Sequence, residues 1–273
     1  MRILRLLAVA FTTLFLAACQ MPPATNSDAA LDPLHGVIAS GVLRIGLSGD
    51  QPPFNMRDRD GALIGLDVDL AEMLANAMGL ETELVTVPFA ELLPALVAAR
   101  VDIVISAMTI TPERNAHVPF AGPYYVSGTA ALTRSDALAR SGSIELLDDA
   151  TRRYAAVAGT TNEAFAREQL PAATLVSTPD FDTAVALVLA GEVDAVLADF
   201  PLCNYATMRY PDAGFSEHMT PFTVEPLGVA IRADAPLLVN LVGNYLDTLE
   251  YAGLLGQLKA RWLGDDAWLD SMP

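Results

Sequence analysis

The sequence is short of cysteine, of histidine and of basic residues. Its 273 residues include 2 cysteines and 3 histidines, and 16 lysines and arginines stand against 33 aspartates and glutamates, for a formal net charge of −17. The acidic residues are scattered, and no basic patch is present that could follow a phosphate backbone. These shortages argue against a nucleic-acid partner and indicate a solvated acidic surface.

Catalytic and metal-binding signatures are equally scarce. His35, His117 and His218 lie far apart without ligand-like spacing, so we expect surface histidines and no metal site. The sequence has no Gly-x-Ser-x-Gly, no Walker loop and no His-Glu-x-x-His motif. We therefore expect a protein that is not an enzyme and that needs no cofactor.

One short apolar run lies at the N-terminus. Arg2 and Arg5 precede Leu6–Leu16, which spans less than about 20 Å as a helix, against the roughly 30 Å that a membrane span needs. The run is therefore typical of an export signal and not of a transmembrane helix. We predict a signal peptide over residues 1–18.

The segment that ends this signal, Leu16-Ala17-Ala18-Cys19, resembles the lipobox of bacterial lipoproteins, in which the cysteine becomes the lipidated first residue. We expect Cys19 to carry a lipid anchor and residues 19–35 to form the anchor and tether. The alternative is a soluble secreted protein that is cut near the same place. Removal of two arginines takes the net charge to −17 − 2 = −19. Cys203 is then alone, without an intrachain disulfide, and we expect it to be a buried small hydrophobe.

The remaining chain alternates between strand and helix patterns, which predicts an α/β protein. Strands are expected at Val42–Leu47, Glu81–Val87, Ile103–Ile105, Gly128–Thr133, Tyr154–Ala158, Leu175–Val176, Ala195–Leu197 and Val224–Ile231. Helices are expected at Leu34–Ala39, from Asp67 to Met78, at Glu91–Ala99, after Asn162, and at Thr183–Ala190, Pro236–Glu250 and Leu254–Trp262. The alternation breaks at Pro119–Tyr125. About 240 residues suit one large domain or two lobes.

The stretch Asp102–Arg114 is the best candidate for a binding site. The buried strand Ile103–Ile105 leads into a tight turn that bears Ser106 and Thr109. A helix then starts with Thr111 as its N-cap, and Arg114 lies one turn inside it. The turn gathers backbone N–H groups, hydroxyls and one guanidinium, which predicts a site for a small anion.

A second copy of this pattern lies further along the chain. Val101-Asp102 before the first strand matches Val193-Asp194 before the strand Ala195–Leu197, and Asp199 follows the second strand. A cation on one lobe and a carboxylate on the other suit a zwitterion such as an α-amino acid. The alternatives, a surface arginine at position 114 and a helix N-cap at Asp199, stay open.

Nearly the whole mature chain resembles the extracytoplasmic solute-binding proteins of family 3, the receptors of polar amino-acid ABC importers. The matching segments are Gly41–Gly46, Pro53-Phe54, Gly65–Ala71, Leu93–Leu96, Val101–Ile103, Thr109–Arg114, Gly122–Tyr125, Gly159–Thr161, Asp194–Asp199 and Leu258–Trp262. The resemblance implies a type II periplasmic-binding-protein fold, with two α/β lobes joined by two crossing hinge strands. Lobe 1 would comprise residues 36–127 and 224–273, and lobe 2 residues 128–223. The hinges would fall near Tyr125–Gly128 and Thr223–Gly228.

The same resemblance implies the site residues. Arg114 would bind the ligand carboxylate with Thr109, Thr160 and Thr161, and Asp199 would hold the ammonium. Phe89 would wall the pocket, although plain core packing is an equal alternative. Ser48, Gln51 and Ala107 take pocket-lining positions.

Two departures from the family pattern bear on the ligand. Ser48 stands where receptors for basic amino acids often carry an acidic residue, which argues against a basic ligand. Gln51 replaces the usual aromatic ring over the ligand.

We expect a monomeric receptor that delivers an amino acid or similar small polar ligand to an ABC permease in the inner membrane. It would work on the periplasmic or extracytoplasmic face, anchored through Cys19. One alternative is an enzyme like the cyclohexadienyl dehydratases, which resemble these receptors, with Glu163 as the nearest proton donor. Another is a ligand sensor for a membrane signalling partner. The ligand, the permease and the membrane that holds the anchor are not specified by the sequence.

Overall fold

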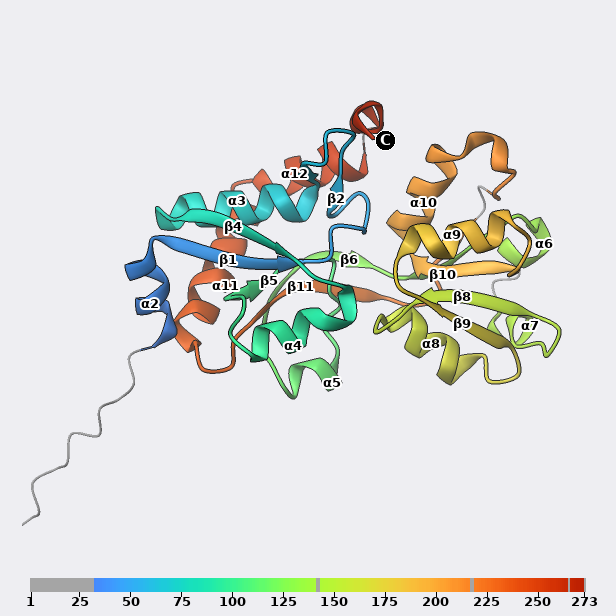
Figure 1. Ribbon diagram of the computed structural model, residues 1–273, viewed down its shortest axis with the longest axis horizontal. Coiled ribbons are helices and arrows are strands. Elements are labelled where there is room, and N and C mark those ends of the chain that lie inside the picture. Colours follow the sequence, from blue (N-terminus) through green and yellow to red (C-terminus); the bar gives the residue numbers. More distant parts are fainter. Residues whose placement is uncertain (1–31, 141–142, 217–218, 265, 273) are drawn as a thin grey trace, which may run out of the picture. The chain divides into compact units, whose positions relative to one another are not determined.

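The computed structural model (Figure 1) describes residues 32–140, 143–216, 219–264 and 266–272. The predicted signal peptide, Cys19, most of the tether and His218 lie outside these ranges. His35 and His117 are exposed, as expected. Among the described residues, no helix has the length and apolar character needed to cross a membrane.

The first sheet is mixed, with the strand order β4-β1-β5-β11-β6. Its strands are β1 (Val42–Leu47), β4 (Glu81–Thr86), β5 (Ile103–Val104), β6 (Phe120–Ser127) and β11 (Glu225–Ile231). Its helices are α2 (Pro33–Ser40), α3 (Leu66–Met78), α4 (Leu92–Val97), α5 (Pro112–Asn115), α11 (Pro236–Tyr251) and α12 (Leu254–Leu263), with the turns η1 (Phe89–Glu91) and η3 (Ala267–Ser271). The Asp60-Gly61 turn joins β2 (Met56–Arg57) to β3 (Leu63–Ile64) in an antiparallel hairpin.

The second sheet has the order β7-β10-β8-β9. Its strands are β7 (Thr129–Thr133), β8 (Arg153–Val157), β9 (Thr174–Thr178) and β10 (Ala195–Asp199). The accompanying helices are α6 (Asp136–Ala139), α7 (Ile144–Leu147), α8 (Thr161–Gln169), α9 (Phe181–Leu189) and α10 (Phe200–Arg209), followed by the turn η2 (Pro211–Ala213). Two α/β lobes result, as predicted.

Successive apolar side chains along a strand point to opposite faces of the sheet, which explains why helices cover both faces of each sheet. In β5, Ile103 joins the apolar cluster that contains α3, whereas Val104 joins the cluster that contains α4. In β10, Val196 packs in the cluster with α9 and α10, whereas Ala195 and Leu197 pack in the one with α8. Figure 1 shows these helices on opposite faces of the two sheets.

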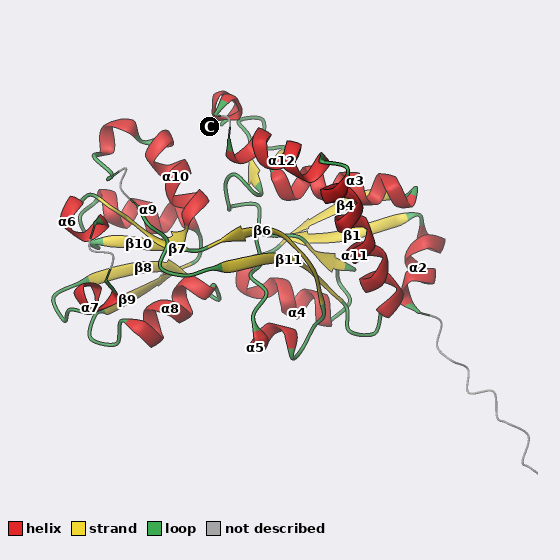
Figure 2. Ribbon diagram, turned by 180° about the vertical axis from the view of Figure 1, so that it is seen from behind, coloured by secondary structure: helices red, strands yellow, loops and turns green. Residues whose placement is uncertain are grey.

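The chain passes between the two sheets twice within the described residues, through β6 and through β11. These strands pair antiparallel as far as Ser127 opposite Glu225, and Figure 2 shows both at the junction of the sheets. Gly128 follows β6, and a Cβ atom at this position would lie 2.1 Å from the carbonyl oxygen of Thr223. Only glycine therefore lets the two connections come so close. The lobe boundaries and hinges proposed above remain predictions.

The sequence repeat corresponds to a structural repeat. Asp102 precedes β5, and its carboxylate accepts the backbone N–H of Arg44 at 3.0 Å and pairs with the Arg44 guanidinium at 2.7 Å. Asp194 precedes β10 and likewise accepts the N–H of Arg153 at 2.8 Å and a guanidinium, that of Arg152, at 3.0 Å. Each aspartate thus fixes the start of one strand against the parallel strand beside it.

The main departures from the expected elements are local. The helix predicted over Glu91–Ala99 is divided into η1 and α4, because Pro94 provides no N–H for a backbone bond within the preceding turn. Residues from Phe120 onward, where the pattern was broken, form the strand β6 even though Pro123 lies within it. Cys203 is fully buried in α10, as expected, and burial raises the pKa of its thiol.

Candidate ligand-binding site

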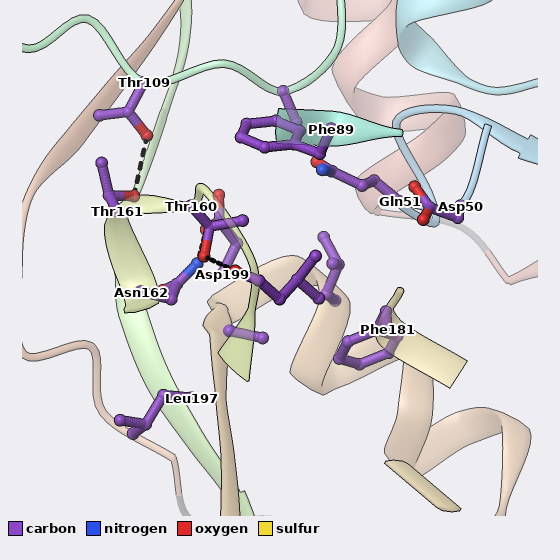
Figure 3. Close-up of a pocket in the computed structure, with 14 residues that line it drawn as sticks. Asp50, Gln51, Phe89, Thr109, Thr160, Thr161, Asn162, Phe181, Leu197 and Asp199 are labelled. Atoms are coloured by element: carbon purple, nitrogen blue, oxygen red, sulfur yellow. Dashed lines mark hydrogen bonds between the residues drawn. The ribbon is translucent and has the colours of Figure 1, made fainter. Parts of the chain in front are cut away.

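A small cavity lies where the strand ends of the two sheets meet (Figure 3). Its walls are Asp50, Gln51, Phe89, Ala107, Thr109, Val157, Thr160, Thr161, Asn162, Phe181, Leu197, Ala198, Asp199 and Leu202. The only ionisable side chains among these residues are the two aspartates. The water-accessible space is about 20 Å³, room for roughly one water molecule. A ligand of amino-acid size would therefore need the walls to move apart.

Asp199 ends β10 and is 7% exposed. Its Oδ1 accepts a hydrogen bond from Asn162 Nδ2 at 2.9 Å, whereas its buried Oδ2 has no partner among the described residues. Burial and the nearby Glu225 charge raise the pKa of Asp199 to about 7, opposed by Asn162, by the approach of Ser127 and by Arg114. A buried carboxylate oxygen without a donor is costly unless a ligand supplies one.

The side chain of Asp199 makes no capping bond to α10, although the residue occupies the N-cap position. The helix-cap alternative therefore does not account for its carboxylate. Asn162, in the first turn of α8, also has a buried oxygen without a partner. Both open acceptors belong to residues of the cavity wall.

Asp50 lies on the other lobe, just beyond β1, and was not among the predicted site residues. Its Oδ1 is buried without a partner. Burial raises the pKa of Asp50, and the charges of Asp180 and Asp182 add to this increase, whereas the nearby Ser48 hydroxyl opposes it. Its position just beyond the carboxyl end of β1 could have indicated a site residue. The family pattern puts the acidic residue two positions earlier, at Ser48.

Arg114 connects the two lobes. Thr111 Oγ1 caps the short helix α5, as predicted, by accepting the Arg114 N–H at 3.1 Å. The guanidinium donates to the carbonyl oxygens of Thr109 at 2.9 Å and Gly159 at 3.1 Å, and it lies 5.6 Å from the centre of the Phe89 ring. Arg114 is half-buried and does not belong to the cavity wall. Its role toward a ligand remains a prediction.

Glu225, at the start of β11, was missed by the sequence reasoning. Its buried carboxylate accepts hydrogen bonds from the hydroxyls of Thr109, Thr129, Thr161 and Thr223. Burial favours the protonated form, but these four bonds outweigh it and lower the pKa of Glu225. A hydroxyl has one proton to donate, so those of Thr109 and Thr161 are already engaged.

Asp67 supports the cavity wall from behind. It is fully buried in the first turn of α3 and accepts bonds from Asn55 Nδ2 at 2.8 Å, the Ala107 N–H at 2.9 Å and the Tyr124 hydroxyl at 2.8 Å. Burial raises the pKa of Asp67 to about 6 in spite of these bonds. Ala107 has a positive φ of 45°, and its bond to Asp67 holds this strained turn in place.

The predicted site residues therefore separate into two groups. Phe89, Gln51, Ala107, Thr109, Thr160, Thr161 and Asp199 line the cavity, while Ser48 and Arg114 do not. Ser48 instead donates its N–H to Ser106 and its hydroxyl to Asn55. Thr160 caps α8 by accepting the Glu163 N–H at 3.1 Å.

Glu163, the proton donor considered for a dehydratase, lies outside the cavity wall. Its carboxylate accepts bonds from the Gly159 N–H and from Ser177, and it pairs with Arg167 at 2.7 Å. Burial alone would raise the pKa of Glu163, but these partners lower it. A carboxylate in this environment is poorly suited to give up a proton.

The family model for bacterial extracellular solute-binding proteins, family 3, matches residues 43–265. The chain belongs to this family. Members of the family are extracytoplasmic binding proteins, and its amino-acid-binding members support a substrate-binding role for this one.

Curated relatives cover most of this family member. The L-cystine-binding protein TcyJ of Escherichia coli (strain K12) is 29% identical over 234 residues, 85% of this chain and 86% of its own length. The cyclohexadienyl dehydratase of Pseudomonas aeruginosa is 29% identical over 230 residues, 84% and 85% of the two chains. The ABC transporter arginine-binding protein 1 of Escherichia coli (strain K12) is 27% identical over 233 residues, which cover 83% of this chain and 93% of its own length.

A solved structure agrees with this assignment. The ancestral amino acid-binding protein AncCDT-1, described as a precursor of cyclohexadienyl dehydratase, is 35% identical. It superposes with a TM-score of 0.78 over 84% of this chain and 99% of its own. Receptors and one enzyme thus lie at similar distances from this family member.

Proposed function

We propose that this protein is the receptor of an ABC importer and binds an amino acid or a similar small polar ligand between its lobes. The observation that carries the proposal is the buried Oδ2 of Asp199, a residue of the cavity wall. No donor among the described residues lies within hydrogen-bond distance of this oxygen, although Ser127 is close enough to lower the pKa of Asp199. A ligand ammonium would donate to this oxygen and to Asn162 Oδ1. Charge pairing of this kind offsets the cost of burying both groups.

The carboxylate of the ligand would be met by Arg114 and by the first-turn N–H groups of α8, which follow Thr160. Two of the Arg114 donors are used by carbonyl oxygens, but a guanidinium carries five N–H bonds. The engaged hydroxyls of Thr109 and Thr161 would hold the turn in place without donating to the ligand themselves.

Transport would depend on opening and closing about β6 and β11. The cavity is too small for an amino acid in this conformation, and Arg114 and Glu225 both bond to groups of each lobe. Ligand would enter an open form and be enclosed when these contacts close, and the closed surface would be recognised by the permease.

We further propose that the protein is exported, that Cys19 is lipidated and that the receptor acts as a monomer at the extracytoplasmic face of the membrane. Radiolabelled palmitate should be incorporated into the full chain and not into Cys19→Ser. Labelling of Cys19→Ser at the level of the wild type would contradict the anchor without affecting the binding proposal. Light scattering on the mature chain gives its oligomeric state.

The dehydratase alternative is kept by the similarity to cyclohexadienyl dehydratase. The carboxylate of Glu163 is already bonded to Gly159, Ser177 and Arg167, and its lowered pKa makes it a poor proton donor, which favours the receptor. Incubation with prephenate or arogenate tests this directly, because an enzyme would release an aromatic product. Turnover that is lost in Glu163→Gln would establish the enzyme and overturn the proposal.

The decisive experiment for the receptor is a thermal-shift screen of the mature chain against the twenty amino acids, followed by calorimetry on each ligand that binds. Binding at about micromolar Kd corresponds to roughly −8 kcal/mol. Asp199→Asn should weaken it by roughly 3–5 kcal/mol, because the ligand ammonium loses its charged partner. Asp60→Asn, at an exposed turn, is the matched control. If no amino acid shifts the melting temperature, the protein is not an amino-acid receptor.

A further inference from the structure

The charge of the cavity wall goes beyond what an α-amino acid requires. Its ionisable side chains are two aspartates, Asp50 from the first lobe and Asp199 from the second. Each has one buried carboxylate oxygen without a partner. A neutral amino acid brings one ammonium, which would leave the second carboxylate buried and unpaired, at considerable cost.

Some of the groups that could receive a ligand anion are already bonded within the protein. Glu225 engages the hydroxyls of Thr109 and Thr161, and two donors of Arg114 bond to carbonyl oxygens. Glu225 also adds a negative charge close enough to raise the pKa of Asp199. The balance of the site therefore favours positive charge on the ligand.

The two carboxylates occupy separate places along the cavity. Figure 3 shows Asp50 beside Gln51 on one side and Asp199 beside Asn162 and Thr160 on the other, with the ring of Phe181 below. Asp199 is more than nine-tenths buried, so its open oxygen is not simply an exposed acidic group. An extended ligand with a charge at each end matches this arrangement.

We propose that the ligand carries two cationic groups, one held by Asp199 with Asn162 and the other by Asp50. This inference rests on the proposed function for the first contact and adds the second. It reverses the expectation that Ser48, lacking a charge, excludes a basic ligand: Asp50, two residues further on, supplies the carboxylate. The ligand is a basic amino acid or a diamine, which share this chemistry.

Calorimetry with three probes tests the proposal. L-lysine has both cationic groups, L-norleucine keeps the amino-acid end and a chain of similar length without the second charge, and cadaverine keeps both charges without the carboxylate. Lysine should bind at least tenfold more tightly than norleucine. Cadaverine binding as tightly as lysine identifies a diamine receptor, and weaker cadaverine binding identifies a basic amino acid; either supports the two-cation site.

Variants of Asp50 test whether this carboxylate holds the second cationic group of the ligand. Asp50→Asn and Asp50→Ser should each weaken lysine binding at least tenfold and should not weaken norleucine binding, which no longer leaves a charged carboxylate unpaired, while Asp60→Asn changes neither. Two substitutions are used so that a single misfolded variant, detected by circular dichroism, does not decide the result. Equal affinity for lysine and norleucine, or unchanged lysine binding in both Asp50 variants, overturns the inference.

The same data separate this inference from the proposed function. If amino acids bind and depend on Asp199 but not on Asp50, the receptor stands and the second cationic contact falls. If cadaverine alone binds and depends on both aspartates, the two-cation site stands and the amino-acid receptor falls. If no probe or amino acid binds, both are wrong.

Discussion

Asp67 and Asp199 are both buried aspartates, one in each lobe, yet their surroundings differ in completeness. Asp67 has a donor for each oxygen, from Asn55, Ala107 and Tyr124. Asp199 has a donor for one oxygen only. Burial raises the pKa of Asp67 to about 6 and that of Asp199 to about 7. A complete set of partners indicates a structural carboxylate, whereas an incomplete set indicates a place for something else.

The largest effect on folding stability should come from Asp67→Asn. At best, the amide nitrogen would lie beside the Tyr124 hydroxyl, which must then accept instead of donating. The neutral amide oxygen would accept from Asn55 and the Ala107 N–H more weakly than the carboxylate does. We expect the free energy of unfolding to fall by about 2–3 kcal/mol, as measured by urea denaturation at pH 7.5. A loss no larger than that of the exposed control Asp60→Asn would remove the distinction between the two aspartates.

Ligand binding should depend on pH through Asp199, since a cation needs the ionised carboxylate and the pKa of Asp199 is about 7. Below pH 7, affinity should rise about tenfold for each pH unit, equal to about 1.4 kcal/mol, and then level off. Asp50, whose pKa is also raised, would steepen this slope. Calorimetry from pH 5 to 8 measures it, and a flat profile would contradict the role of Asp199.

Asp199→Asn should stabilise the protein without ligand. The pKa of Asp199 rises from 3.8 to about 7 on folding, so the folded state holds the proton more tightly. Its contribution to stability is present below pH 4 and is lost as the pH rises through 7. At pH 8 we expect the variant to gain about 1 kcal/mol. Unfolding curves at pH 5 and 8 provide the test, and a gain that is equal at both values would point to another cause.

The smallest effect is expected for Glu225→Gln. Four threonine hydroxyls surround this carboxylate, and hydroxyls can rotate to accept a bond from the new amide. The loss of stability should therefore be about 0.5–1 kcal/mol, less than that of Asp67→Asn, in the same urea measurement. Because its pKa is lowered, Glu225 stabilises the fold above its ordinary pKa and loses this contribution in acid, so the variant should unfold less steeply with acidification. A loss above that of Asp67→Asn would reverse the ranking.

The sequence was sufficient to predict residues that are marked by their position at the end of a single strand or the start of a single helix. Asp199 was found because it ends a buried strand, and Thr111 because it precedes a proline at a helix start. The two-lobed α/β fold followed from alternating patterns and from the family resemblance. The structural repeat at Asp102 and Asp194 was visible as two Val-Asp pairs.

Glu225 and Asp67 could not be predicted in the same way, because their partners come from distant parts of the chain. Glu225 is surrounded by hydroxyls that are 2 to 116 positions away in sequence, and Asp67 meets Tyr124 57 positions on. Asp50 could have been predicted from its place just beyond the carboxyl end of β1. The family pattern, however, puts the acidic residue at the position of Ser48. Which polar atoms remain unpaired depends on packing and not on local pattern.

The burial of Cys203 has a practical consequence for observing closure. The side chain is fully buried and its thiol pKa is raised, so a maleimide dye should not react with it in the folded protein. A chain that begins after Cys19 therefore offers a background without accessible thiols. One cysteine introduced on α4 and one on α8 could then carry a donor and an acceptor dye, and energy transfer between them would report the distance across the cavity as ligand is added.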